Sequence, residues 1–301
     1  YETLVSMNND GTVSPMLTED YKISEDGLTY TFFIRKGVKW HSGYGELSAE
    51  DVKFTFDRMT DDNVGALVQD YLNYSNIVSV EAADQYTAVI TLAQRDDDFI
   101  SRLGSFAANI LCKAFYDEKG IEGMQSTPIG TGAFEFAGGT LGDRTEAVRF
   151  ADYWQETTGN VDRVICTVIA DANTSYQAFD MGEISAIQCY DRDRINQYRA
   201  MGYNITMFPV LQLLYAGMNM QTAPFDNEKV REAFFAAIDP QYYIDNLYYG
   251  EETTCASYIP AACKYALRED YFSTTTSYDP QRAKELLAEA GHPDGVNITL
   301  W

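Results

Sequence analysis

Residues 30–58 read YTFFIRKGVKWHSGYGELSAEDVKFTFDR, and the fold that the sequence predicts is built around this stretch. Bulky side chains recur at every second position from Tyr30 to Ile34, which is typical of a strand with one face against a core. Three glycines and a serine then predict a turn that brackets Trp40 and His41. The stretch therefore begins with a half-buried strand that ends in a tight turn.

A helix is predicted immediately after this turn. Ser48 and Asp51 have the spacing of a capping box, so the helix is expected to begin at Ala49. Apolar residues at helical spacing should form its buried face, with charged residues toward water. These apolar residues are Val52, Phe56 and Met59.

The rest of the chain predicts alternating strands and helices, which is typical of α/β architecture. A hairpin is expected to turn at residues 25–27, and a second hairpin should pair residues 77–81 with 86–92. Asn227 and Asp279 are placed to cap two later helices. Three further strands are expected at Val161–Ala170, Ile184–Cys189 and Val210–Met220. The first of these is apolar enough to be buried on both faces of a central sheet.

Composition indicates a folded acidic protein of more than one unit. The chain has 301 residues, of which 46% are hydrophobic and 14% aromatic, so it is long enough for two substantial units. Its net charge of −23 repels phosphate backbones and anionic membranes, and nucleic-acid binding is therefore not expected. No run of about 18 apolar residues predicts a membrane-spanning helix.

The sequence contains no recognisable catalytic or metal-binding motif. It lacks the nucleophile elbow, zinc-protease and phosphate-loop patterns. Its five cysteines include no CxxC pair and it has only two histidines, so no metal site and no cofactor is expected. The glycines of Gly130-Thr131-Gly132 are expected to serve a turn with positive φ, and the acidic run at residues 96–98 a solvated turn or helix cap.

Several blocks of sequence, in this order, resemble the extracellular solute-binding proteins of family 5. That family comprises the oligopeptide, dipeptide and nickel receptors of ABC importers. The resemblance is strongest in residues 29–58, and it extends over nearly the whole chain. The other blocks are Pro128–Gly132, Asp152–Trp154, Met181–Ala186, Ala223–Asp239 and Tyr278–Gly291.

The resemblance implies an α/β fold of the type II, cluster C periplasmic-binding-protein class, with mixed sheets flanked by helices. Residues 1–127 would form an extra α/β subdomain of the first lobe, and residues 128–255 the core of that lobe. Residues 256–301 would form the crossover and the start of the second lobe. The extreme N-terminus and most of the second lobe are expected to be missing from this sequence.

The resemblance also implies a two-lobed receptor that captures oligopeptides or dipeptides outside the membrane and delivers them to the permease subunits of an ABC transporter. Such a receptor would be a monomer without catalytic activity, in the periplasm or at the cell surface, with a lipid anchor in the full-length protein. The same fold could instead bind an oligosaccharide, a metal chelate or haem. An extracellular hydrolase that uses carboxylates is a more remote alternative.

Five residues are candidate ligand contacts. Asn219 and Tyr258 match positions that line the cleft in similar peptide receptors. Tyr215 and Met218 are neighbours of Asn219 in the expected strand, and Tyr71 is a further candidate. Trp40 and His41 are expected to serve the fold rather than to contact the ligand.

Overall fold

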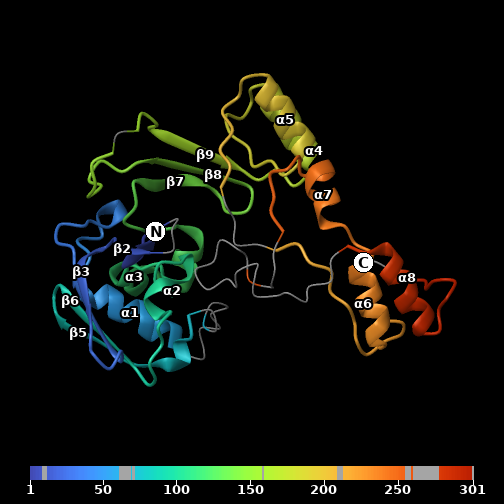
Figure 1. Cartoon of the computed structure of the whole chain (residues 1–301). Coiled ribbons are helices and arrows are strands. Elements are labelled where there is room, and N and C mark those ends of the chain that lie inside the picture. The colour runs from blue at the N-terminus through green and yellow to red at the C-terminus, as the bar shows by residue number, and fades with distance from the viewer. Residues whose placement is uncertain are drawn as a thin grey trace. The chain divides into compact units, whose positions relative to one another are not determined.

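The structure is a computed structural model that describes residues 1–8, 12–60, 69, 72–157, 159–208, 213–254, 259 and 278–299. The chain forms two compact units, Tyr1–Ser175 and Tyr176–Trp301, and each is described by itself. All strands found in the described residues belong to the first unit (Figure 1). The boundary between these two units does not correspond to the subdomain and lobe boundaries expected after residues 127 and 255. Those boundaries stay a prediction.

In the first unit, strands alternate with short helices and 3-10 turns. Its elements are β1 (Val5–Met7), β2 (Val13–Pro15), β3 (Thr18–Ile23), β4 (Thr29–Ile34), η1 (His41–Gly43), α1 (Ala49–Thr60), η2 (Tyr74–Asn76), β5 (Ile77–Asp84), β6 (Thr87–Leu92), α2 (Phe99–Arg102), η3 (Phe106–Ala108), α3 (Lys113–Ser126), β7 (Phe134–Thr140), β8 (Arg144–Arg149) and β9 (Arg163–Thr167). The later part of the chain contains α4 (Ala172–Asp180), α5 (Arg192–Ala200), α6 (Glu228–Ala236), α7 (Pro240–Leu247) and α8 (Pro280–Glu289).

A four-stranded antiparallel sheet in the order β3-β4-β6-β5 forms the centre of the first unit. Both predicted hairpins are present, as β3–β4 and β5–β6. Tyr30, Phe32 and Ile34 of β4 are at most 3% exposed, and the residues between them are only partly covered. The period-two pattern therefore identified the buried face correctly.

Helix α1 covers this sheet and lies against β5 and β6 (Figure 1). It begins at Ala49 as predicted, and its predicted apolar face is buried. Asp51 Oδ2 accepts the backbone N–H of Ser48 at 2.9 Å, which is half of a capping box. Asp51 Oδ1 accepts the N–H of Lys113 at 3.0 Å, so the same carboxylate also fixes the start of α3. Burial raises the pKa of this carboxyl, against the effect of its hydrogen bonds.

A second sheet, in the order β7-β8-β9, is also antiparallel and corrects one expectation. The strand expected at Val161–Ala170 is shorter, and it lies at the edge of this sheet rather than in a buried centre. Ile165 is 46% exposed and Val168 is 61% exposed. An apolar run predicts burial on both faces of a strand, but only the tertiary packing decides whether another element covers those faces.

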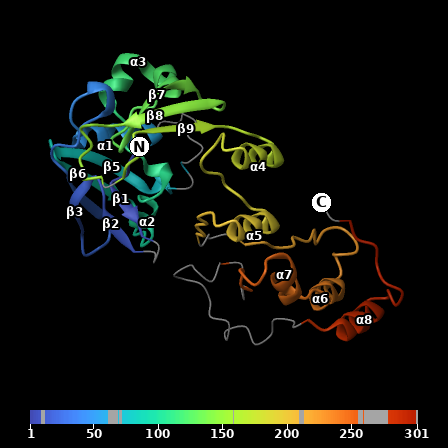
Figure 2. The ribbon, with the colours of Figure 1, turned by 90° about the horizontal axis from the view of Figure 1, so that it is seen from above.

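Helices α6 and α8 begin where the predicted caps Asn227 and Asp279 place them, and α7 begins after Asp239, a cap that was not predicted from the sequence. Asn227, Asp239 and Asp279 each accept a backbone N–H from the first turn of α6, α7 and α8, respectively. Helices α6 and α8 lie side by side (Figure 2) around a small apolar cluster. This cluster consists of Ala233, Ala236, Ala283 and Leu286.

Two expected strands are absent from this part of the chain. Residues 184–189 form no strand, and neither do residues 213–219, the described part of the strand expected at Val210–Met220. Leu214 is 87% exposed and Tyr215 is 81% exposed. A strand needs a partner to pair its backbone groups, and hydrophobic composition alone does not supply one.

Substitutions at two adjacent phenylalanines test which face of β4 is the core. Phe32 is fully buried, so Phe32→Ala should lower the free energy of unfolding by about 3–5 kcal/mol. Phe33 points to the other face, where Lys22 lies 5.4 Å from its ring centroid, and Phe33→Ala should cost about 1 kcal/mol. Urea unfolding followed by circular dichroism measures both, and equal losses would contradict the assigned faces.

Candidate ligand-binding site

Three of the five candidate ligand residues lie on one exposed segment of the second unit. Tyr215 and Asn219 are exposed and Met218 is partly buried. Tyr258 and Tyr71 lie outside the residues that the structure describes. Tyr215, Met218 and Asn219 thus lie close together, as their positions in the sequence already require. The structure does not test the predicted ligand contacts of Tyr258 and Tyr71.

Asn219 forms a turn instead of continuing a strand. Its side-chain Oδ1 accepts the N–H of Gln221 at 3.0 Å, and its backbone carbonyl accepts the N–H of Thr222 at 3.3 Å. This is the Asx-turn geometry that Asn favours. The side-chain amide nitrogen takes no part in this turn and has no hydrogen-bond partner among the described residues. It can therefore donate to an incoming acceptor.

The segment is attached to α6 through Arg231. The Nη1 of Arg231 donates to the carbonyl oxygens of Phe225 at 2.8 Å and Asp226 at 3.2 Å. The rings of Phe225 and Phe234 meet edge to face, with centroids 5.6 Å apart. These contacts explain why the block from Ala223 to Asp239 occurs as a unit, since its arginine holds the turn that precedes the helix.

In the first unit, four distant pieces of sequence meet around the turn Gly130–Gly132. Glu2 is 7% exposed and has no cationic partner among the described residues. Its carboxylate accepts hydrogen bonds from Thr131 Oγ1 at 2.7 Å, Tyr153 OH at 2.8 Å and Trp154 Nε1 at 3.0 Å. Three donors satisfy most of the acceptor capacity of this buried charge. Burial raises the pKa of the Tyr153 hydroxyl, and the hydrogen bond to the Glu2 carboxylate raises it further.

His41 holds the same turn from the other side. Its backbone N–H donates to the Gly130 carbonyl at 2.9 Å, its Nδ1 accepts the Gly130 N–H at 3.2 Å, and its Nε2 lies 2.8 Å from the Gly132 carbonyl. A carbonyl can only accept, so Nε2 carries the hydrogen and the ring is neutral. Burial lowers the pKa of His41, against the effect of the bond to Gly132. We call this arrangement of Glu2 and His41 around Gly130–Gly132 the clasp.

Close approach, not positive φ, explains the glycine at position 130. Neither Gly130 nor Gly132 has a positive φ, so the turn predicted there is wrong in its conformation. A Cβ at Gly130 would lie 2.9 Å from the Tyr1 nitrogen and 3.1 Å from Tyr1 Cα. A Cβ at Gly132 would meet nothing closer than 3.9 Å. The clasp therefore excludes a side chain at one of the two glycines only.

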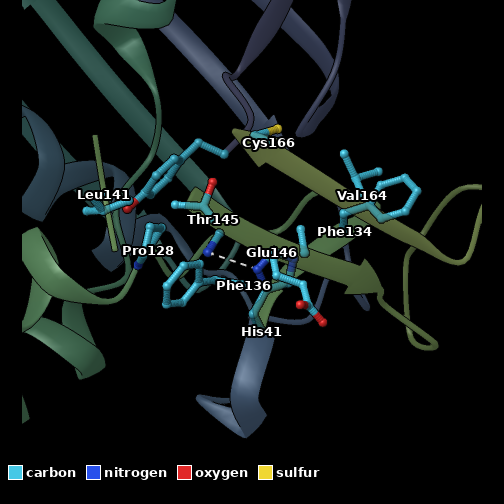
Figure 3. Close-up of a pocket in the computed structure, with 12 residues that line it drawn as sticks. His41, Pro128, Phe134, Phe136, Leu141, Thr145, Glu146, Val164 and Cys166 are labelled. Carbon is cyan, nitrogen blue, oxygen red and sulfur yellow. Dashed lines mark hydrogen bonds between the residues drawn. The ribbon is translucent and has the colours of Figure 1, made fainter. Parts of the chain in front are cut away.

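A hollow of about 200 Å³ lies beside the clasp, against the β7–β9 sheet (Figure 3). Its lining is mainly apolar and includes Phe134, Phe136 and Val164, and His41 also lines it. The one carboxylate on it, Glu146, is bonded to Arg163 at 2.5 Å. The hollow contains none of the five candidate ligand residues.

The described residues contain neither a metal-binding cluster nor a membrane-spanning helix. No group of three or more His, Cys, Asp or Glu side chains there is arranged to hold a metal ion. No helix in that part of the chain is long and apolar enough to cross a membrane. The acidic run at residues 96–98 is a hydrogen-bonded turn, as expected, because the Asp96 carboxylate accepts from Asn73, Arg102 and the N–H of Asp98.

The sequence profile described as "Bacterial extracellular solute-binding proteins, family 5 Middle" matches residues 12–300. The chain belongs to this family. The clasp unites three blocks of the family resemblance, at residues 29–58, 128–132 and 152–154.

Individual relatives agree with this assignment. The glutathione-binding protein GsiB of Salmonella choleraesuis (strain SC-B67) is 32% identical over the whole chain, and heme-binding protein A of Haemophilus influenzae (strain Rd) is 31% identical. The chain spans 57% and 58% of these relatives, respectively. The structure of periplasmic binding protein DppA from Helicobacter pylori, in complex with the peptide STSA, superposes with a TM-score of 0.75. It is 28% identical over 98% of this chain and 61% of DppA. The fold is thus that of type II periplasmic binding proteins.

Sequence reasoning found one side of the clasp and missed the other. Trp40 and His41 were expected to serve the fold, and both are at most 3% exposed. Glu2 was not singled out, because a single glutamate near the start of the sequence carries no periodic or spacing signal. Its partners lie about 130 to 150 residues away, and only the folded chain brings them to it.

Alanine at the two glycines of the turn should have opposite consequences. Gly130→Ala should destabilise the protein by about 1–3 kcal/mol, because its Cβ would overlap the Tyr1 backbone. Gly132→Ala should be neutral or stabilising by a few tenths of a kcal/mol, since it removes freedom only from the unfolded chain. Melting temperatures of the two variants provide the comparison, and equal shifts would contradict the close approach.

Removal of the buried carboxylate should cost more than removal of a nearby exposed one. Glu2→Ala leaves Thr131 Oγ1 and Trp154 Nε1 without their acceptor, while Tyr153 OH keeps Gln155 Oε1 at 3.4 Å, and it should lower the free energy of unfolding by about 2–3 kcal/mol. Asp152→Ala removes only an exposed ion pair with Lys39 and should cost less than about 1 kcal/mol. Urea titration would measure the difference. A Glu2 variant as stable as the Asp152 variant would show that the clasp is dispensable.

Proposed function

We propose that the protein containing this chain is the substrate-binding component of an ABC transporter, and that it captures oligopeptides or dipeptides outside the membrane for delivery to a permease. The observation that carries the proposal is the family match over residues 12–300, together with the superposition on a peptide-bound receptor. Family 5 proteins are extracellular transport receptors. We also propose that this one is a monomer, has no enzymatic activity and is lipid-anchored.

The exposed segment of the second unit is suited to an extended peptide. Residues 213–218 form no strand, and their backbone groups have no partners among the described residues. Extended peptides bind largely through main-chain hydrogen bonds, with pockets for alternate side chains. Tyr215 adds a large apolar face with one polar group, and Asn219 adds a free amide.

The proposed ligand contacts are therefore Asn219, Tyr215 and Met218, with Tyr258 and Tyr71 as further contacts from residues that the structure does not describe. Asn219 is the strongest of these, because its turn fixes the side chain while leaving two amide hydrogens unused. In the first unit, the clasp and the hollow contribute no residue to this set.

A different cargo is the second candidate. One relative is named as a heme-binding protein and another as a glutathione-binding protein. Such relatives share this part of the chain, so the fold alone does not select a peptide. An oligosaccharide or a metal chelate belongs to the same alternative, whereas a hydrolase that uses carboxylates lacks any supporting geometry in the described residues.

Calorimetry on the whole protein tests the proposal. The purified protein should be titrated with mixed di- to hexapeptides, with glutathione, and with haem. Saturable binding of a peptide supports the proposal, and binding of haem alone supports the second candidate. If none of these ligands binds to protein freed of co-purified ligand by unfolding and refolding, the peptide proposal fails.

Substitution at the exposed segment should weaken binding without unfolding the protein. Asn219→Ala and Tyr215→Ala should each reduce affinity for the bound ligand about tenfold, or about 1.4 kcal/mol. Val78→Ala is the control, because Val78 is 65% exposed on β5 of the first unit. Calorimetric dissociation constants that do not change in the two segment variants would remove these residues from the site.

A further inference from the structure

His41 is a buried titratable group that the proposed function does not use. It is 3% exposed, and its ring meets Phe150 edge to face at a centroid distance of 4.8 Å. Both ring nitrogens and the backbone N–H are engaged by residues Gly130 and Gly132. Among the described residues, no other side chain bonds to the backbone of both glycines. The imidazole of His41 therefore links η1 to the turn before β7.

The direction of these hydrogen bonds makes the tie specific for a neutral ring. The Gly130 N–H points a hydrogen at Nδ1, which must therefore be unprotonated to accept it. A proton on Nδ1 would remove the acceptor and place two hydrogens against each other. We propose that His41 is a protonation-sensitive latch, which holds the turn Gly130–Gly132 at neutral pH and releases it in acid.

The charged groups that face the ring are carboxylates. Glu2 from the start of the chain and Glu135 from β7 favour a cation on the ring. Glu146 of β8 lines the same hollow but is paired with Arg163. Burial outweighs these charges and lowers the pKa of His41. The unfolded or opened turn therefore takes up a proton first as the pH falls below about 6.5.

Release would be local. The turn leads directly into β7, which begins at Phe134 and pairs with β8. Among the described residues, the His41 ring nitrogens bond only to the backbone of Gly130 and Gly132, and to no atom of α1 or of the β3–β6 sheet. Glu2 holds Thr131 through a hydrogen bond that does not involve the His41 ring. Acid should therefore loosen residues 128–136 before it unfolds the first unit.

Hydrogen–deuterium exchange with mass spectrometry on the whole protein tests the latch. After correction for intrinsic exchange, protection of peptides covering residues 128–136 should fall about tenfold or more between pH 7.5 and 5.0. Peptides from α1 should keep their protection. His41→Gln, which cannot take up a proton, should abolish the pH dependence of residues 128–136.

The other histidine provides a matched control. His292→Gln should leave the acid dependence of residues 128–136 as in the wild type, because His292 lies in the second unit after α8. Equal acid dependence in the His41→Gln variant would overturn the proposal. If that variant does not fold, the wild type decides alone, since unchanged protection of residues 128–136 at the two pH values would also overturn it.

Discussion

The first unit depends on a buried carboxylate and a buried neutral imidazole that grip one short turn. Glu2 and His41 together bind the turn Gly130–Gly132 through its backbone and through the hydroxyl of Thr131. The Glu2 carboxylate has no cationic partner among the described residues, and the His41 ring is neutral. Each is instead satisfied by hydrogen-bond donors and acceptors placed by the fold. Removal of the Glu2 carboxylate would leave Thr131 Oγ1 without its acceptor, and removal of the His41 ring would do the same to the Gly130 N–H.

This constraint explains why the family resemblance is spread over separate blocks. The blocks at residues 29–58, 128–132 and 152–154 have no local reason to occur together, yet all three contribute to the clasp. Arg35 adds a further link, since its guanidinium lies 4.4 Å from the ring centroid of Trp154. The signature stretch therefore identifies the family through its packing, and the candidate ligand residues lie on a different part of the chain.

The second unit is organised differently. Its helices are defined by local signals, with an aspartate or asparagine cap at the start of each of α5 to α8. A small cluster of alanines and leucines and the ion pair between Lys229 and Glu289 join α6 to α8. Large apolar side chains such as Tyr215 and Leu214 remain exposed. The segment around Asn219 therefore exposes both apolar and polar side chains.

Local features of the sequence determined the β3–β6 hairpins, helix α1 and the capped helices, because alternation and capping depend on neighbours within a few residues. The ordered motifs also indicated the family. Three other features were decided only by the tertiary structure: the edge position of β9, the absence of a strand at residues 213–219, and the clasp on Glu2. Each depends on which distant groups meet. A strand is buried only if something covers it, and a carboxylate is held inside only if donors from elsewhere in the chain reach it.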